Sequence, residues 1–221
     1  SVAPYEYYKG SVNNANNMVT IDIGGGTSDV VIASNGGVDC ISSFRFAANS
    51  LFGDAYAQQG GGSINSLLTC YKPAIKKILD DNQLVELSKI CDSHFEDRIS
   101  CNIASFFFSL KENKEVIGKG VNSHLDFNKM LQNDNDFKIV FLLFYSALVY
   151  HVAMMMKSKG KEMPRHICFS GNGSKVIKIL TTSNETLEEY TKLLFEKVYG
   201  EKYPFDGLTI LQNERNPKEV T

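Results

Sequence analysis

The sequence predicts an α/β fold in which a long helical insertion interrupts the sheet-forming segments. Short runs of β-branched residues separated by glycine-rich turns occupy residues 18–46. A short apolar strand, a second glycine-rich turn and a helix follow one another over residues 166–180. The stretch between these regions is more polar and mostly helical in its periodicity. We therefore expect an α/β core made of residues 1–58 and 137–221, with a helical inserted subdomain at 59–136.

A three-stranded antiparallel meander is expected at the start of this core. Residues 1–17 are polar and rich in tyrosine and asparagine, and we expect a loop there. The first two strands are predicted at 18–21 and 30–33, where apolar, β-branched residues are continuous. A second glycine turn then leads into a third strand at 38–46, in which Ile41 and Phe44 are expected to be core residues.

The turn between the first two strands is the first candidate site, and its sequence is Asp22-Ile23-Gly24-Gly25-Gly26-Thr27-Ser28-Asp29. Consecutive glycines expose a row of backbone N–H groups that no side chain covers, and such a concavity suits an anion, phosphate above all. Asp22 would place a carboxylate beside it, and Mg²⁺ is typically held by one or two carboxylates together with phosphate oxygens. The alternative is a structural hairpin turn, although a two-residue turn needs fewer glycines.

The middle of the chain is predicted to be helical. We expect a short helix over 47–59, a flexible connection over 60–63, and insertion helices over residues 64–79, 82–91, 94–113 and 125–131. The apolar run 139–156 that follows is long enough to cross a membrane. We favour a helix buried in a layered α/β domain and expect no membrane, because polar residues interrupt the run and nothing else in the chain resembles a membrane segment.

A second glycine-rich turn follows the strand predicted at 166–169, and its sequence is Ser170-Gly171-Asn172-Gly173-Ser174-Lys175. A helix is expected after it, ending at about Leu180. Such a helix directs its first N–H groups and its dipole towards a ligand. Glycine-rich turns of this kind are common. This turn is better evidence for a ligand site because the first candidate turn precedes it in the chain. A helix closed by Gly200 and a strand at 208–211 complete the core.

Composition narrows the classes of partner and compartment. The formal net charge is −2, so the chain lacks the basic surface that nucleic-acid binding requires. Its five cysteines include no C-x-x-C pair and no histidine at zinc-finger spacing, which argues against a disulfide scaffold and a structural zinc site. Reduced thiols and the lack of a signal peptide predict a cytoplasmic protein. Because the chain begins with Ser1, we expect it to be a piece of a longer protein.

Together the two turns resemble the nucleotide-binding motifs of the actin-like ATPase superfamily, which contains actin, the heat-shock chaperone ATPases and sugar kinases. D-I-G-G-G-T-S-D at 22–29 is similar to the second phosphate motif, and I-C-F-S-G-N-G-S-K at 167–175 is similar to the adenosine motif. N-P-K-E-V at 216–220 resembles the start of the last core helix of the chaperone ATPases. The resemblance spans about 17–58 and 137–221 and implies a ribonuclease-H-like core.

The resemblance implies a role for each residue of the two turns. Asp22 would hold the water shell of Mg²⁺ or orient the attacking water. The β- and γ-phosphates of ATP, or the phosphates of ADP, would be bound by Gly24, Gly25, Gly26 and Thr27. The adenosine would be backed by Gly171, Asn172, Gly173 and Ser174, with Lys175 beside the base. Phosphoryl transfer depends on such positioning and charge neutralisation more than on covalent chemistry by the protein.

The resemblance also implies that part of the nucleotide site lies outside this chain. In the superfamily a first lobe supplies another phosphate loop, and no other Asp-x-Gly-x-x-x loop precedes Asp22. The chain therefore resembles the second lobe only, and we expect it to be inactive alone. The stretch that would clamp the adenine is A-S-F-F-F at 104–108, which we expect to be core packing, so the choice of base stays open.

Three functions stay open for the parent protein. The first is a chaperone-like or actin-like ATPase. The second is an actin-like filament or scaffold subunit in which the nucleotide only regulates packing, with protein partners bound by the insertion at 64–136. The third is a small-molecule kinase of the same superfamily, which would need a substrate-activating aspartate from the first lobe.

Overall fold

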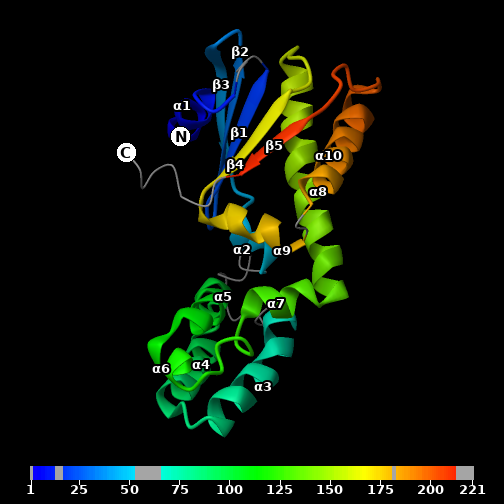
Figure 1. The fold of residues 1–221 in the computed structure, drawn as a ribbon. Helices are drawn as coiled ribbons and strands as arrows, with labels where there is room; N and C mark the ends of the chain where they lie inside the picture. The colour runs from blue at the N-terminus through cyan, green and yellow to red at the C-terminus, as the bar shows by residue number, and fades with distance from the viewer. Residues whose placement is uncertain (1, 13–16, 53–65, 181–182, 213–221) are drawn as a thin grey trace. The chain divides into compact units, whose positions relative to one another are not determined.

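A computed structural model describes residues 2–12, 17–52, 66–180 and 183–212 of the chain (Figure 1). The chain divides into two compact units. The first comprises Ser1–Ala48 and Phe141–Thr221, and the second comprises Asn49–Val140. The segment at 60–63, the end of the helix expected at 47–59 and the segment at 216–220 lie outside the described residues. Each unit is described by itself below.

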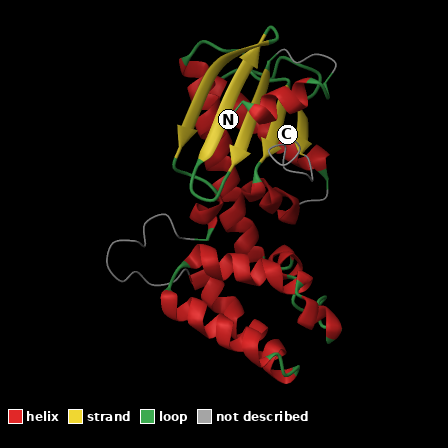
Figure 2. Ribbon diagram, turned by 90° about the vertical axis from the view of Figure 1, so that its left-hand side faces the viewer, coloured by secondary structure: helices red, strands yellow, loops and turns green. Residues whose placement is uncertain are grey.

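The first unit is built on a five-stranded mixed sheet, whose strands are yellow in Figure 2. The strand order is β3-β2-β1-β4-β5. The strands are β1 (Met18–Ile23), β2 (Ser28–Ser34), β3 (Gly37–Phe44), β4 (His166–Ser170) and β5 (Thr209–Gln212). β1, β2 and β3 form an antiparallel meander, whereas β4 pairs in parallel with both β1 and β5. The predicted α/β fold, with a meander followed by parallel strands, is confirmed.

Helices cover both faces of this sheet, because alternate side chains of each buried strand point to opposite faces. On one face, the ring of Tyr145 in α8 (Asn135–Ser158) lies 5.9 Å from that of Phe169 in β4. α10 (Asn184–Tyr199) packs beside α8, where Thr191 and Tyr145 share a hydrogen bond of 2.7 Å. As predicted, α10 ends at Gly200, which has a φ of 79°.

The other face is covered by α1 (Ala3–Lys9), where a loop was expected. Pro4 lies in the first turn of this helix, and Tyr5 and Tyr8 are buried in a cluster with Met18. The Tyr8 hydroxyl donates a hydrogen bond of 3.0 Å to the Phe169 carbonyl oxygen. The loop prediction was wrong because it followed the polar composition of the segment and overlooked Pro4 and the three-residue spacing of the tyrosines.

The prediction that Ile41 lies in the core was also wrong. Its side chain is 56% exposed. β3 is an edge strand of the sheet and pairs only with β2, so its residues are less buried than those of the central strands. Alternation along the sequence predicts the face on which a residue lies, but only the strand order decides whether that face is covered.

The second unit is helical. Its elements are the end of α2 (Ala48–Leu51), α3 (Ser66–Asp81), α4 (Val85–Asp97), α5 (Ser100–Ser109), α6 (Lys114–Gly118), α7 (Phe127–Gln132) and the start of α8. Phe107 is fully buried, with its ring 6.0 Å from that of Phe95 and 5.2 Å from that of Phe127. The core packing expected of the three phenylalanines is therefore confirmed for Phe106 and Phe107, whereas Phe108 is only partly buried.

The helix boundaries inside the insertion differ from those predicted. A break was expected at 92–93, whereas α4 continues to Asp97 and the chain turns at Arg98, which has a φ of 55°. The Asp92 carboxylate lies 3.0 Å from the Lys72 ammonium and 2.5 Å from that of Lys76, both on α3. These contacts lie between helices, so the local sequence could not predict that Asp92 stays in the helix.

One helix of the described chain, α8, is long and apolar enough to cross a membrane by length and composition. This is weak evidence, because the core helix of a soluble protein passes the same test. One side of α8 is buried against the sheet and α10, as expected. The opposite side is not: Leu143 is 67% exposed, and Tyr150 and Met154 are also exposed.

Candidate functional site

The two predicted glycine turns lie side by side at one end of the sheet. β1 and β4 are adjacent and parallel, with Asp22 in register with Ser170, so the turns that follow them leave the sheet together. A β-carbon added to Gly171 would lie 2.4 Å from Asp22 Oδ1. One added to Gly173 would lie 2.6 Å from the Gly24 carbonyl oxygen. Glycine is therefore required at both positions for this close approach.

The first turn presents a small exposed tip. The Gly24 N–H donates a 2.9 Å hydrogen bond to the Thr27 carbonyl, and the Gly24 carbonyl accepts one of 3.2 Å from the Ala48 N–H. Gly24 thus closes the turn with its own backbone groups. Gly25, Gly26 and Thr27 are exposed, so the tip offers their backbone to a ligand.

The second turn is more tightly built. Gly171 has a φ of 81°, a conformation that favours glycine. The hydroxyl of the buried Ser174 donates to the Gly171 carbonyl at 2.8 Å, and Gly173 is buried as well. Asn172 and Lys175 are exposed. Of the residues expected to back the adenosine, Gly173 and Ser174 therefore shape the turn, while the other side chains are accessible.

The helix that follows the second turn is short. The turn passes into a 3₁₀ segment, Asn172–Val176, and then into α9 (Ile177–Leu180). Since the macrodipole of such a short helix is small, the helix would contribute little to the binding of a ligand at this turn.

A row of polar side chains crosses the sheet beside the two turns. Asp22 is the register partner of Asp29 on β2 and of Ser170 on β4. Register partners lie on the same face of a sheet. Ser43 on β3 continues the row, and its hydroxyl donates a hydrogen bond of 2.7 Å to Asp29 Oδ1. Asp22 and Ser170 are 5% and 3% exposed, so the inner half of the row is buried.

This row fits a hydrated Mg²⁺ held mainly by a polyphosphate, and it does not fit an all-protein metal cage. In the described part of the chain, no group of three or more histidine, cysteine or acidic residues could hold a metal. Two carboxylates directly opposite each other, Asp22 and Asp29, repel, and a cation would relieve this. The Ser170 hydroxyl is buried with no hydrogen-bond partner among the described residues, which costs about 1–3 kcal/mol unless a ligand or water satisfies it.

Asp29 and Ser170 were not among the site residues predicted from the sequence. Asp29 could have been found, because counting back across the hairpin places it opposite Asp22. Ser170 could not, because its place beside Asp22 depends on the pairing of two strands that are distant in sequence.

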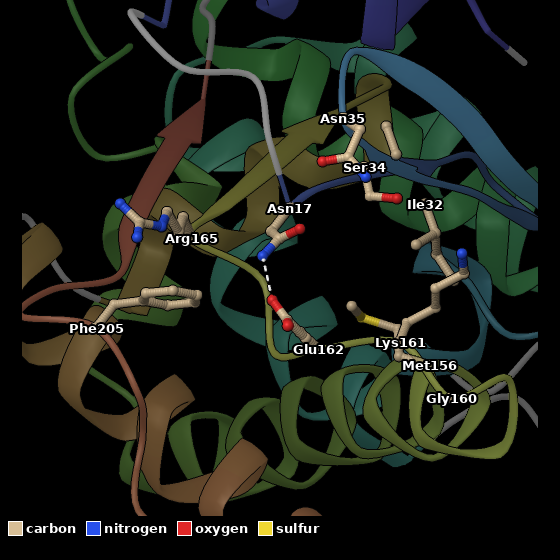
Figure 3. A pocket seen from close by; sticks show the side chains of 11 residues that line it. Asn17, Ile32, Ser34, Asn35, Met156, Gly160, Lys161, Glu162, Arg165 and Phe205 are labelled. Carbon is tan, nitrogen blue, oxygen red and sulfur yellow. Dashed lines mark hydrogen bonds between the residues drawn. The ribbon is translucent and has the colours of Figure 1, made fainter.

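A pocket of about 400 Å³ lies at the opposite end of the sheet and contains none of the predicted site residues (Figure 3). Asn17, just before β1, donates from Nδ2 to Glu162 Oε2 at 2.9 Å. The Arg165 guanidinium stacks 4.2 Å above the Phe205 ring. Lys161 forms a 3.0 Å ion pair with Asp39. Asn17, Glu162, Lys161 and Arg165 thus each have a partner, in contrast to the Ser170 hydroxyl.

No family model matches the sequence, and no curated protein matches it. The actin-like resemblance therefore rests on the two motifs and on the way in which their turns meet. What the geometry offers chemically is a glycine tip with accessible backbone, a carboxylate pair beside it and a second glycine turn in contact with the first.

Proposed function

We propose that this chain is a nucleotide-binding lobe of an actin-like or chaperone-like ATPase, with the phosphates and Mg²⁺ at residues 22–27 and the adenosine at 171–175. The observation that supports this most strongly is the contact between the two turns. A nucleotide needs its phosphate and nucleoside sites within one ligand length of each other, and the turns meet at the Gly24 carbonyl and Gly173.

Each part of the ligand has a chemically suitable neighbour. The exposed backbone of Gly25, Gly26 and Thr27 suits phosphate oxygens. Asp22 supplies the carboxylate for the water shell of Mg²⁺. In the second turn, the exposed Lys175 and Asn172 can flank the sugar and base. The turns themselves are held in place by buried groups such as Ser174, so little ordering is required on binding.

The parent protein would hydrolyse ATP with the help of a first lobe, which supplies the remaining phosphate contacts. This chain alone is therefore expected to bind nucleotide weakly and to show no turnover. Sustained Mg²⁺-dependent hydrolysis by the chain itself would contradict the assignment of a single lobe.

An NMR titration of the whole 221-residue chain with ADP and Mg²⁺ tests the proposal. Amide shifts are expected to be concentrated at 24–27 and 171–175, with millimolar affinity. Asp22→Asn should remove most of the dependence on Mg²⁺, because it removes the carboxylate charge. Lys161→Gln, in the pocket at the far end of the sheet, is the matched control and should bind as the wild type does. Shifts confined to that pocket, or no shifts at all, would contradict the proposal.

The second candidate function is an actin-like assembly module. Leu143, Ala147, Tyr150 and Met154 are exposed on α8 at spacings of one helical stripe, and large apolar patches mark interaction surfaces more often than chance. In the insertion, Val85 and Ile90 of α4 are exposed and could contact a protein partner. This function is favoured if light scattering rises with protein concentration and with ATP, and if Leu143→Lys abolishes that rise. Scattering that is changed neither by ATP nor by Leu143→Lys would exclude it.

A further inference from the structure

We propose that Ser170 is a positioning residue of the site: its hydroxyl and the Asp22 carboxylate hold the same oxygen, a water bound to Mg²⁺. This inference rests on the proposed nucleotide function and gives a role to a residue of the second motif for which the resemblance implied none. A water bound to a cation can donate two hydrogen bonds. The Asp22 carboxylate would accept one and Ser170 Oγ the other, and these two bonds would fix the orientation of the water and of the ion.

The first support is that Ser170 differs from the other buried serines. Ser28 Oγ donates to the Phe46 carbonyl at 2.6 Å, and Ser174 Oγ donates to the Gly171 carbonyl at 2.8 Å. Ser88 is hydrogen-bonded to Asp80 and Lys76. Ser170 Oγ alone among the described buried serines has no partner, although its residue is only 3% exposed. A buried hydroxyl without a partner is unfavourable, so a group that satisfies it on binding is expected.

The second support is the position of the hydroxyl. Ser170 and Asp22 are register partners on adjacent parallel strands, so their side chains share one face of the sheet. The next residue, Gly171, has no side chain, and a β-carbon there would collide with Asp22 Oδ1. The carboxylate is therefore held against the backbone of the second turn, beside the Ser170 hydroxyl. A water that satisfied both groups would therefore lie where the two turns meet.

The third support comes from the charges around the hydroxyl. Asp29 lies on the other side of Asp22 in the same row, so the site has two carboxylates on one face. Both accept hydrogen bonds and neither can donate when ionised. A neutral hydroxyl at Ser170 adds an acceptor without adding a third negative charge, which suits a water of a cation shell better than another acid would.

The stability of the unliganded protein separates this role from a structural one. Ser170→Ala removes a hydroxyl that has no partner, so the Tm without nucleotide should stay unchanged or rise. Ser28→Ala is the matched control, since it removes a buried hydroxyl that does have a partner, and it should lower the Tm by roughly 2–4 °C. An equal loss of Tm in Ser170→Ala would show a structural role and overturn the inference.

Binding supplies the decisive measurement. ADP is titrated by NMR with Mg²⁺ and again with EDTA, using wild type, Ser170→Ala and Ser170→Cys. Ser170→Ala should weaken the gain in ADP affinity due to Mg²⁺ roughly tenfold, as loss of a group supporting a metal ligand typically does, and should leave Mg²⁺-free binding unchanged. Ser170→Cys, with a weaker acceptor of similar shape, should fall between the two.

The outcomes distinguish this inference from the proposed function. If wild type gains affinity from Mg²⁺ and Ser170→Ala keeps the whole gain, the role of Ser170 is wrong while nucleotide binding stands. If Ser170→Ala weakens binding equally with and without Mg²⁺, the hydroxyl acts on the nucleotide or the turn and the inference is again wrong. If wild type does not bind ADP under either condition, the proposed function fails and this inference fails with it.

Discussion

At the scale of single residues, the glycines of the second turn matter because they have no side chain. Gly173 does not have a left-handed backbone, yet a β-carbon there would lie 2.6 Å from the Gly24 carbonyl oxygen and 2.8 Å from Ile23 Cγ2. Gly171 is constrained both by its φ of 81° and by Asp22. The absence of side chains at these two positions therefore allows two backbones to touch.

Gly173→Ala should destabilise the protein by about 2 kcal/mol, because the backbone carbonyl that it meets cannot move aside as a flexible side chain could. The Tm is expected to fall by roughly 4–8 °C in a thermal melt. Gly207→Ala is the control, since nothing lies within 4 Å of a β-carbon there. A Gly173→Ala variant as stable as Gly207→Ala would show that the two turns are not packed as described.

At the scale of elements, the start of α8 shows how a local cap is tied to another helix. Asp134 Oδ1 accepts a hydrogen bond of 3.0 Å from the Phe137 N–H, in the first turn of α8. Its second oxygen accepts a hydrogen bond from the Tyr71 hydroxyl of α3. The hydrogen bond from Tyr71 holds the pKa of Asp134 below its usual value. The pKa of Tyr71 is raised, mainly by burial and secondly by the Asp134 carboxylate.

Tyr71→Phe should therefore destabilise the helical unit in a pH-dependent way. The folded pKa of Asp134 is depressed, so the stabilisation is complete above the unfolded value of about 3.9 and is lost as the pH falls through the folded pKa. At pH 7 the cost should be about 1 kcal/mol, because the pair is partly exposed.

Urea unfolding of wild type and Tyr71→Phe at pH 7 and at about pH 2.5 measures this difference. The difference in the free energy of unfolding should shrink at the lower pH, where Asp134 becomes protonated. Tyr150→Phe, which changes an exposed tyrosine of α8, should have no effect at either pH. A cost for Tyr71→Phe that does not change with pH would rule out the charged hydrogen bond as its cause.

At the scale of the whole molecule, the two units have separate cores of different kinds. The first is organised by a central sheet whose strands β1 and β4 come from distant parts of the sequence. The second is a helical core around Phe107, formed from a continuous stretch of chain. Local helical contacts form more readily than long-range strand pairs, so the units are expected to differ in their opening behaviour.

Native-state hydrogen exchange in low urea should therefore reveal two groups of amides. Those of β1 and β4 are expected to open together, and those of α3 and α5 to open together with a different free energy and a different urea dependence. Identical opening free energies and urea slopes for both groups would show that the chain unfolds as one cooperative unit.

Much of the fold could be predicted from the sequence because its signals are local. The β-branched runs, the glycine turns and the helical periodicity lie within short windows, and they predicted the meander and most helices. The misses have two causes. The exposure of Ile41 and the retention of Asp92 in α4 depend on residues that are distant in sequence. The helix α1 was missed although its signals, Pro4 and the spacing of the tyrosines, are local.

The sequence alone determined the α/β class, the two glycine turns and the carboxylate at Asp22, because turn chemistry and strand patterning are written in neighbouring residues. Only the tertiary structure decided that the turns touch, that Gly24 closes its own turn, and that Ser170 lies buried beside Asp22. These facts follow from the parallel pairing of β1 with β4, and strand pairing across more than a hundred residues leaves no local trace in the sequence.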